Sequence, residues 1–206
     1  EIEDLIAEED MVVTISSAGY IKRLPVSGYR KQKRGGKGVT AMEMRDEDFV
    51  RHLFVASTKD YLLIFSNQGR VYWLKVYEIP QVGRQAKGKA IINLVQMSQG
   101  EQISAVISVK EFSEGKYLVM CTRQGSIKKT DLTSFSNPRK GGIVGITLEK
   151  GDALIATALT DGKGEILLVT RSGKSIRFKE GQVRDMGRQA KGVKGVSLLK
   201  KDEVID

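Results

Sequence analysis

The sequence has little of the chemistry that forms cross-links, metal sites or membrane spans. It contains one cysteine and one histidine in 206 residues, which excludes a disulfide within the chain and an ordinary Cys/His zinc site. No apolar run approaches the roughly 18 residues of a membrane-spanning helix, and the acidic residues 1–10 are unlike the start of a signal peptide. These absences predict a cytoplasmic chain with no metal and no membrane partner.

Acidic residues are fewer than basic ones, 25 Asp and Glu against 34 Lys and Arg, so the formal net charge is +9 at pH 7. A basic excess of this size favours a polyanionic partner. Only 3 prolines stand beside 22 glycines, and 40% of the residues are hydrophobic. This composition is typical of a folded, turn-rich β protein rather than a disordered tail.

A pattern of about fifty residues occurs four times along the chain. Each copy begins with an apolar run, a turn that ends on glycine and a second run, which is the signature of a β-hairpin. The turn glycines are 50, 56 and 48 residues apart. They are Gly19, Gly69, Gly125 and Gly173.

Each hairpin is followed by a basic segment that contains glycine and then by a third apolar run. The second and fourth basic segments are identical and read GRQAKG. A fourth run completes the first three copies, whereas the last copy reaches only residues 204–206. The basic segments are residues 31–38, 83–88, 138–142 and 187–192, and the third runs are residues 39–44, 90–95, 143–148 and 193–198.

Four strands per copy predict an all-β fold of propeller-like blades, since one such sheet cannot bury both faces until it stacks on a neighbour. The alternative, an ordinary β-sandwich, accounts less well for copies that share strand order, turns and basic segments. We expect a linker or closing segment at residues 1–10 and a repeat domain at residues 11–206. The predicted blades are residues 11–56, 61–109, 117–159 and 165–206.

The basic residues gather in four stretches that run from each hairpin through the third run, residues 11–42, 69–100, 123–148 and 170–201. These stretches hold 27 of the 34 basic residues and 4 of the 25 acidic ones. If every blade places its basic segment at the same position, the side chains form a stripe that suits the phosphates of double-stranded DNA. Glycine favours the same interpretation, since backbone N–H groups can approach an anion where no Cβ intervenes.

Residues that could carry other chemistry do not form a recognisable catalytic set. Residues 83–89 read G-x-x-x-x-G-K, close to a phosphate-binding P-loop, but Ala90 stands where a magnesium-binding hydroxyl is required. His52 lies in an apolar run with no nucleophile near it in sequence, and Cys121 ends another run, so both are expected to be core residues. We predict a chain with no catalytic residues and no cofactor.

The string from Gln32 to Gly38 closely resembles the GyrA box, Gln-Arg-Arg-Gly-Gly-Lys-Gly, of the C-terminal domain of DNA gyrase A. Only Lys33 differs, and it keeps the charge of the arginine. The resemblance covers the chain from about Asp4 onward. It implies a β-pinwheel whose basic rim bends and wraps DNA and so supports negative supercoiling by a type II topoisomerase. The catalytic tyrosine of that family belongs to a region that this sequence lacks.

The resemblance also implies partners and leaves alternatives. In a full-length parent the partners are the N-terminal region of gyrase A and the gyrase B protein, in the cytoplasm at the bacterial nucleoid. The alternatives are the C-terminal domain of topoisomerase IV, whose box is usually degraded, and a propeller scaffold that binds an acidic protein. The family disc normally has five or six blades, so four repeats leave open whether the ring closes or forms an open arc.

The predicted DNA-binding residues are the box, the basic residues of the matching segments in later repeats, and basic residues of the second hairpin strands. They are Lys22, Arg23, Lys31, Gln32, Lys33, Arg34, Gly35, Gly36, Lys37, Gly38, Arg84, Lys87, Lys128, Lys129, Arg139, Lys140, Arg177, Arg188 and Lys191.

Overall fold

The computed structural model describes residues 2–28 and 48–206, and within these ranges the regular structure consists of β-strands and short 3-10 helices. The strands are β1 (Asp10–Ser16), β2 (Tyr20–Pro25), β3 (Val50–Ser57), β4 (Tyr61–Ser66), β5 (Arg70–Lys75), β6 (Lys89–Ala90), β7 (Ile103–Val109), β8 (Tyr117–Thr122), β9 (Ser126–Asp131), β10 (Ile143–Val144), β11 (Leu154–Thr160), β12 (Glu165–Val169), β13 (Ser175–Lys179) and β14 (Val193–Lys194). The 3-10 helices are η1 (Ile2–Leu5), η2 (Val26–Gly28), η3 (Val76–Glu78), η4 (Ile91–Asn93), η5 (Leu132–Phe135) and η6 (Glu180–Gln182). The predicted all-β fold class is confirmed.

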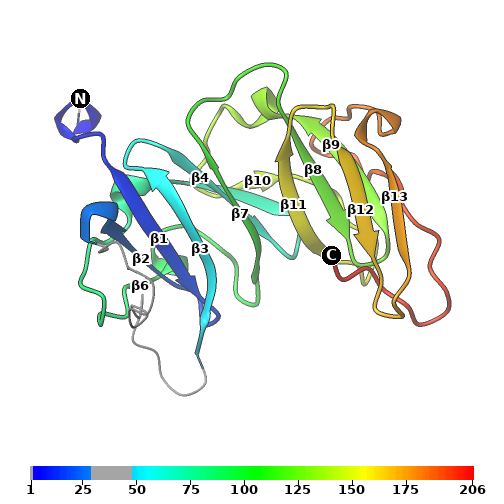
Figure 1. Cartoon of the computed structure of the whole chain (residues 1–206), viewed down its shortest axis with the longest axis horizontal. Helices are drawn as coiled ribbons and strands as arrows, with labels where there is room; N and C mark the ends of the chain where they lie inside the picture. Colours follow the sequence, from blue (N-terminus) through cyan, green and yellow to red (C-terminus); the bar gives the residue numbers. More distant parts are fainter. Residues whose placement is uncertain (1, 29–47) are drawn as a thin grey trace, which may run out of the picture. The chain divides into compact units, whose positions relative to one another are not determined.

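The described strands form three four-stranded antiparallel sheets and one two-stranded sheet (Figure 1). The four-stranded sheets have the orders β3-β1-β2-β6, β10-β5-β4-β7 and β11-β8-β9-β14, and the fourth sheet is the hairpin β12-β13. Beside β12, Thr170 and Val204 form an antiparallel bridge. The pairing of β11 with β8 in the third sheet begins in the same way, with Leu154 opposite Thr122.

Each four-stranded sheet takes one edge strand from the following repeat. β6 comes after the second hairpin in sequence, yet it pairs with β2 of the first, with Tyr20 opposite Ala90 and Ile21 opposite Lys89. β10 pairs with β5, and β14 with β9, by the same rule. The repeat pattern predicts all four strands of a sheet within one repeat, and the structure corrects this prediction. Periodicity shows that a strand exists, whereas the unpaired edge of the preceding hairpin decides where it pairs.

Glycine ends each hairpin turn for a conformational reason. Gly19, Gly69, Gly125 and Gly173 have φ between 79° and 91°, the left-handed region that glycine enters without steric cost. The amide of each donates to the carbonyl three residues earlier, as in Gly125 to Thr122 at 3.0 Å. The four predicted hairpins are confirmed.

Burial differs between the repeats. In β4 and in β8 every residue after the first is buried, whereas β12 contributes one buried residue, Leu168, and β13 contributes none. Leu168 packs against the third sheet, so the β12–β13 hairpin lies beside β8 and β11 (Figure 1). The buried members of this cluster are Val119, Cys121, Ile127, Leu168, Val183 and Val204.

The chain divides into two compact units. The first contains Glu1–Leu62, Leu74–Gln96 and Ser108–Lys110, and the second contains Leu63–Trp73, Met97–Ile107 and Glu111–Asp206. Within the first unit the start of the chain is bonded to the residue that follows β3 and to the end of β5. Thr58 donates its hydroxyl to the carbonyl of Ala7 at 2.6 Å, and Lys75 pairs with Glu3 at 3.0 Å. No helix of the described residues is long and apolar enough to cross a membrane.

Candidate nucleic-acid interface

Two loops with the same sequence, GRQAKG, have the same backbone arrangement at residues 83–88 and 187–192. In each, the alanine amide donates to the carbonyl of the first glycine, at 3.1 and 3.2 Å. Each loop ends on a left-handed glycine, Gly88 with φ 86° and Gly192 with φ 87°. The following two residues pair with the second strand of the preceding hairpin. The loop is therefore fastened to a sheet that belongs mainly to the repeat before it.

The ammonium group of Lys22, on β2, lies against the first of these loops. Its Nζ donates to the carbonyls of Gly83 at 3.3 Å and Ala86 at 3.0 Å, and also to that of Arg84. Lys22 is 0% exposed. These three bonds use the whole donor capacity of an ammonium group.

Lys128, on β9, has the equivalent place under the second loop. Its Nζ donates to the carbonyls of Gly145 at 2.6 Å and Ala190 at 3.2 Å, and also to that of Arg188. Lys128 is also 0% exposed. In both loops the bonded carbonyls include those of the arginine and the alanine, so the two lysines make matching contacts 60 to 64 residues along the chain.

Burial lowers the pKa of both lysines, because water stabilises an ammonium group better than the protein interior does. The effect is larger at Lys128, where burial and the nearby Arg188 guanidinium lower the pKa to about 8. At Lys22 burial alone lowers the pKa. The carbonyls oppose this shift, since a neutral amine has only two N–H donors for three acceptors.

The structure contradicts the prediction that Lys22, Lys128 and Lys129 contact DNA. Lys22 and Lys128 are fully buried, so their ammonium groups cannot reach a phosphate. Lys129 is 7% exposed, with its Nζ 4.9 Å from the centre of the Tyr117 ring and bonded to the carbonyl of Glu180 at 3.5 Å. These side chains were predicted to be exposed because the sequence does not show whether the ammonium group of a lysine on a strand lies in solvent or against backbone carbonyls.

Arg23 also makes internal contacts. Its Nε donates to the carbonyl of Ile79 at 2.7 Å, and its guanidinium reaches the carbonyl of Tyr77 at 3.4 Å. The side chain is partly buried, and it fastens the segment that leads into the first GRQAKG loop. Its predicted contact with DNA remains a prediction.

The basic residues of the loops themselves reach the surface. Lys87 and Lys191 are exposed, and Arg84 and Arg188 are half-buried. The Nζ of Lys87 lies 3.6 Å from the centre of the Tyr20 ring, and Arg84 donates to the carbonyl of Gly28.

Lys191 has a carboxylate beside it, whereas the described contact of Lys87 is the Tyr20 ring. The Nζ of Lys191 lies 2.8 Å from Glu149, and both side chains are more than half exposed. An exposed pair of this kind contributes only about 0 to 1 kcal/mol, so Lys191 can exchange Glu149 for another anion.

The third repeat carries a different loop. Arg139 and Lys140 are exposed, and the loop continues into β10, which pairs with β5. In the hairpin of the second repeat, Tyr72 stands at the position that Lys22 and Lys128 have in their own hairpins. Its hydroxyl donates to the buried carboxylate of Glu101. Burial and this hydrogen bond raise the pKa of Tyr72 to about 12. Gly142 lies against the ring, since an added Cβ would approach Tyr72 to 2.7 Å.

The remaining predicted residues fall into two groups. Arg177, on β13, is exposed and lies 3.8 Å from Glu165 on the neighbouring strand. The rest lie outside the described residues, so the structure does not place them. They are Lys31, Gln32, Lys33, Arg34, Gly35, Gly36, Lys37 and Gly38.

The chain matches the family described as the DNA gyrase C-terminal domain, beta-propeller, over residues 10–57, 60–110, 116–161 and 164–206. The chain belongs to this family. The prediction made from the GyrA box is therefore confirmed at the level of the family.

Curated relatives, each named as the A subunit of DNA gyrase, resemble this chain along its length. The relative from Salmonella typhimurium is 48% identical over 204 residues, which is 99% of this chain and 23% of the relative. The relative from Halalkalibacterium halodurans is 51% identical over 197 residues, 96% of this chain and 24% of the relative. The chain thus spans about a quarter of the length of the curated relatives it matches.

Two solved structures are similar to this chain in fold and sequence. The C-terminal domain of DNA topoisomerase IV has a TM-score of 0.81 at 31% identity, covering 98% of this chain and 61% of that one. The DNA gyrase A C-terminal domain has a TM-score of 0.75 at 27% identity, covering 96% of this chain and 64% of that one.

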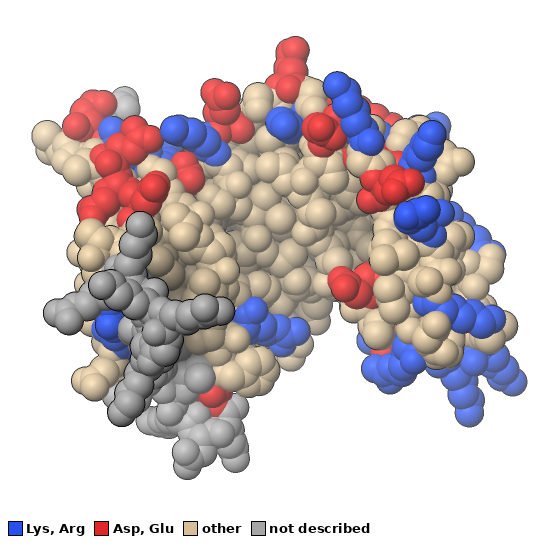
Figure 2. Space-filling model, viewed as in Figure 1, with Lys and Arg blue, Asp and Glu red and all other residues tan. Residues whose placement is uncertain are grey.

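Four exposed basic residues outside the predicted set follow the GRQAKG loops or lie at the last hairpin turn. Lys89 and Lys194 closely follow the two GRQAKG loops and are exposed, as are Arg171 and Lys174 at the last hairpin turn. Figure 2 shows Lys and Arg gathered at the lower end of the β12–β13 hairpin, where this turn lies, whereas its upper end also carries Asp and Glu. The charge counts over residues 69–100 and 170–201 are the signal that could have found these side chains.

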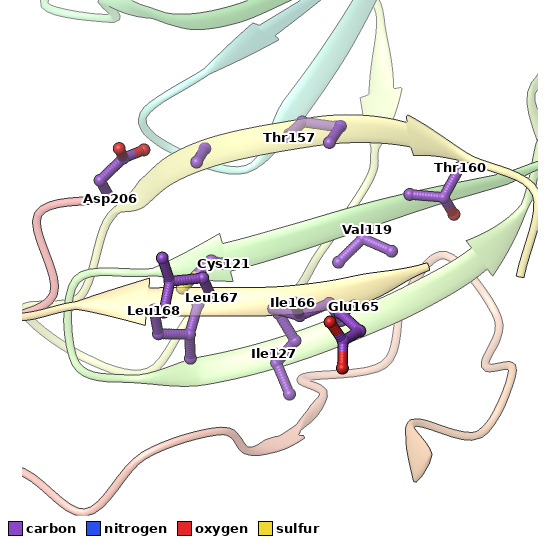
Figure 3. A pocket seen from close by; sticks show the side chains of 12 residues that line it. Val119, Cys121, Ile127, Thr157, Thr160, Glu165, Ile166, Leu167, Leu168 and Asp206 are labelled. Atoms are coloured by element: carbon purple, nitrogen blue, oxygen red, sulfur yellow. The ribbon is translucent and has the colours of Figure 1, made fainter. Parts of the chain in front are cut away.

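An apolar cavity of about 310 Å³ lies between β11 and β12 in the second unit (Figure 3). Aliphatic side chains line most of it, and Glu165 and Asp206 contribute the carboxylates at its margin. Cys121 lies in its wall, where burial raises the pKa of the thiol to about 12. A thiol with that pKa is protonated at neutral pH and is a poor nucleophile.

Proposed function

We propose that this gyrase C-terminal domain binds double-stranded DNA without sequence specificity, and bends and wraps it to support negative supercoiling by a type II topoisomerase. The observation that carries the proposal is the repeated GRQAKG loop, which presents an exposed lysine, Lys87 or Lys191, from a backbone held by a buried ammonium group. The relatives named as the A subunit of DNA gyrase and the topoisomerase IV neighbour support the same role.

The chemistry of these loops fits phosphate better than bases. Lysine is a point charge on a flexible stem, and it neutralises a phosphate without the fixed two-pronged geometry that reads a base edge. Each neutralised phosphate releases condensed counterions, so the affinity falls as salt rises. We assign such contacts to Lys87, Lys191, Arg139 and Lys140, and to Lys31 and the box at residues 32–38.

In the parent protein this domain serves a reaction whose cleavage chemistry belongs to other regions. We propose that its partners there are the N-terminal region of gyrase A and the gyrase B protein, and that it works in the bacterial cytoplasm at the nucleoid. The domain itself contributes binding and bending. Its box distinguishes it from the topoisomerase IV counterpart.

A salt titration against duplexes of increasing length tests the proposal. If each of four repeats neutralises about two phosphates, the slope of log affinity against log salt is about −7. The affinity also rises with duplex length until the track is filled. A slope shallower than about −3, together with length-independent binding, contradicts the proposal and favours the acidic-protein scaffold.

Fluorescence transfer between the two ends of a bound duplex tests the bending. We expect the quadruple variant Lys31→Ala, Lys33→Ala, Arg34→Ala and Lys37→Ala to keep much of its affinity through the other repeats while the DNA ends move apart. Bending by 40 to 90° costs about 1 to 6 kcal/mol, so losing contacts at one end of the arc opens it. Unchanged transfer in this variant contradicts the role given to the box.

A further inference from the structure

The residue type at one hairpin position varies between the repeats together with the sequence of the loop that contacts it. This position lies three residues after the turn glycine and holds Lys22, Tyr72, Lys128 and Ile176 in the four repeats. Lysine at this position is followed, in the next repeat, by GRQAKG, and tyrosine is followed by the different loop at residues 136–142. The two features share one structural contact, because the side chain lies against the loop of the following repeat.

The contact between lysine and loop is the same in both places. In each, the ammonium group donates to the carbonyls of the loop arginine and the loop alanine, and a third carbonyl accepts its remaining N–H. The third carbonyl belongs to Gly83 for Lys22 and to Gly145 for Lys128. No carboxylate of the described residues forms an ion pair with either lysine, so backbone carbonyls, mainly those of the loop, are the described partners of the charge.

This contact has an electrostatic consequence for an anion at the surface. A carbonyl oxygen turned outward would repel a phosphate, whereas a carbonyl bonded to an ammonium group points inward and leaves side chains outward. The left-handed glycine at the end of the loop, Gly88 or Gly192, fixes where the chain leaves it. The buried charge also adds positive potential beneath the loop, where water screens it little.

We propose that Lys22 and Lys128 are positioning residues, each of which holds the GRQAKG loop of the following repeat so that its lysine and arginine meet the DNA backbone. This inference rests on the proposed function and adds two residues that act without touching DNA. Packing alone does not require lysine here, since Tyr72 fills the same position in the second sheet and directs its hydroxyl to Glu101.

The main test compares two lysines that both carry one charge. Lys128→Met keeps the aliphatic stem and removes the three donors, and Lys163→Met removes a charge from an exposed turn. We expect Lys128→Met to weaken DNA binding about tenfold near 0.1 M salt and to make the salt slope shallower by about 2, as if two phosphate contacts were lost. We expect Lys163→Met to stay within about twofold. A folded Lys128→Met with the affinity and slope of the wild type overturns the proposal.

A double-mutant cycle separates positioning from a general loss of stability. If Lys128 acts through its loop, Lys128→Met adds nothing to the variant that carries both Arg188→Ala and Lys191→Ala. The same change remains additive with Arg139→Ala, which lies on a different loop. Full additivity with Arg188→Ala and Lys191→Ala contradicts the proposal.

A measurement on the wild type remains available even if Lys128→Met does not fold. Nitrogen-15 spectra of the lysine side chains should show protected ammonium protons for Lys22 and Lys128, because three hydrogen bonds slow their exchange with water. On addition of a short duplex, the Nζ signals of Lys87 and Lys191 should shift and those of Lys22 and Lys128 should stay. Rapid exchange at Lys22 and Lys128 in the free protein overturns the anchoring geometry.

The same spectra distinguish failure of this inference from failure of the proposed function. If the wild type does not bind duplex DNA, the proposed function fails and the positioning role fails with it, although the protected ammonium signals persist. If the wild type binds DNA and Lys128→Met binds equally well, only the positioning role fails.

Discussion

Three loops have the same place in their sheets but are held by different contacts. Two of them are the GRQAKG loops at residues 83–88 and 187–192, and the third is the loop at residues 136–142. The first two lie over a buried ammonium group that gathers their carbonyls. The third is held through the backbone pairing of Ile143 with Val71 and by Arg70, whose guanidinium donates to the carbonyl of Gly141 at 2.7 Å. The strand exchange is therefore common to all three, whereas a fully buried ammonium group is described only beneath the GRQAKG loops.

The difference shows how a repeat keeps its architecture while a local contact changes. Where lysine is present, three backbone carbonyls accept from it, all in the loop for Lys22 and two in the loop for Lys128. Where tyrosine is present, Glu101 supplies one acceptor to its hydroxyl. A buried polar group is tolerated in either case because it has a partner. Exchanging lysine and tyrosine at this position without changing the loop is therefore expected to lower the free energy of unfolding.

The largest effect is expected from the glycine that ends the loop. Gly192 has φ 87°, and an added Cβ would lie 2.5 Å from the carbonyl oxygen of Ile127. Gly192→Ala is therefore expected to lower the free energy of unfolding by about 2 to 4 kcal/mol, from backbone strain and a forced shift of the loop. Chemical denaturation measures this.

Gly187 is the matched control for Gly192 in the same loop. Its φ is not in the left-handed region, and nothing lies within 4 Å of an added Cβ. We expect Gly187→Ala to leave the unfolding free energy within about 0.5 kcal/mol of the wild type. Equal losses at Gly187 and Gly192 would mean that the close contact with β9 is not what selects glycine.

The next effect concerns the tyrosine anchor. Tyr72→Phe removes one of the donors to the buried carboxylate of Glu101, which also accepts from Ser66 and from the Ser98 amide. We expect a loss of about 1 to 3 kcal/mol in unfolding free energy and unchanged DNA affinity, with Tyr77→Phe as the control. A fall in DNA affinity as large as that expected for Lys128→Met would remove the distinction between the two anchors.

The pH dependence of Lys128 gives a smaller, graded effect. The pKa of about 8 in the folded chain lies below the ordinary value of 10.5, so between these values the unfolded chain binds the extra proton. This group therefore makes the unfolding free energy rise with pH from about 8 to 10.5, and its buried charge costs stability below pH 8.

The sign can be checked with one variant. Because Lys128→Met has no titrating group at this position, its unfolding free energy should lack the rise above pH 8 that the wild type shows. Above pH 8 the loop amides of the wild type should also exchange faster, since the neutral amine no longer bonds three carbonyls. A midpoint for Lys128 near 10.5 in a side-chain NMR titration would exclude this behaviour.

The smallest effect distinguishes the two identical loops from each other. Lys191 pairs with Glu149, whereas Lys87 lies over the Tyr20 ring. Glu149→Gln is expected to tighten DNA binding about twofold, because Lys191 no longer has to break an ion pair with a carboxylate before it contacts a phosphate. The change in unfolding free energy is expected to be at most about 0.5 kcal/mol. Glu165→Gln, which removes the partner of Arg177, is the comparison at another exposed pair. Weaker DNA binding by Glu149→Gln would mean that Glu149 orients Lys191 rather than competing for it.

Much of the fold could be predicted from sequence because its signals are local. The turn glycines and the alternation of apolar runs identified the four hairpins, and these lie where they were expected. The basic segments also indicated Lys87, Lys191, Arg139 and Lys140, which lie exposed in the structure, and their contact with DNA stays a prediction. Lys22, Lys128 and Lys129 were misjudged because their acceptors lie far along the chain.

The sequence by itself determined the all-β class, the fifty-residue repeat, the hairpin turns and the membership in the gyrase C-terminal domain family. These depend on residues a few positions apart, where the left-handed preference of glycine and the burial of apolar runs act within one hairpin. Only the tertiary structure decided that β6, β10 and β14 cross to the preceding sheet and that Lys22 and Lys128 lie beneath a loop. Both depend on backbone groups that are distant in sequence and need hydrogen-bond partners once they are buried. The sequence does not show which of these distant groups lie close together in the fold.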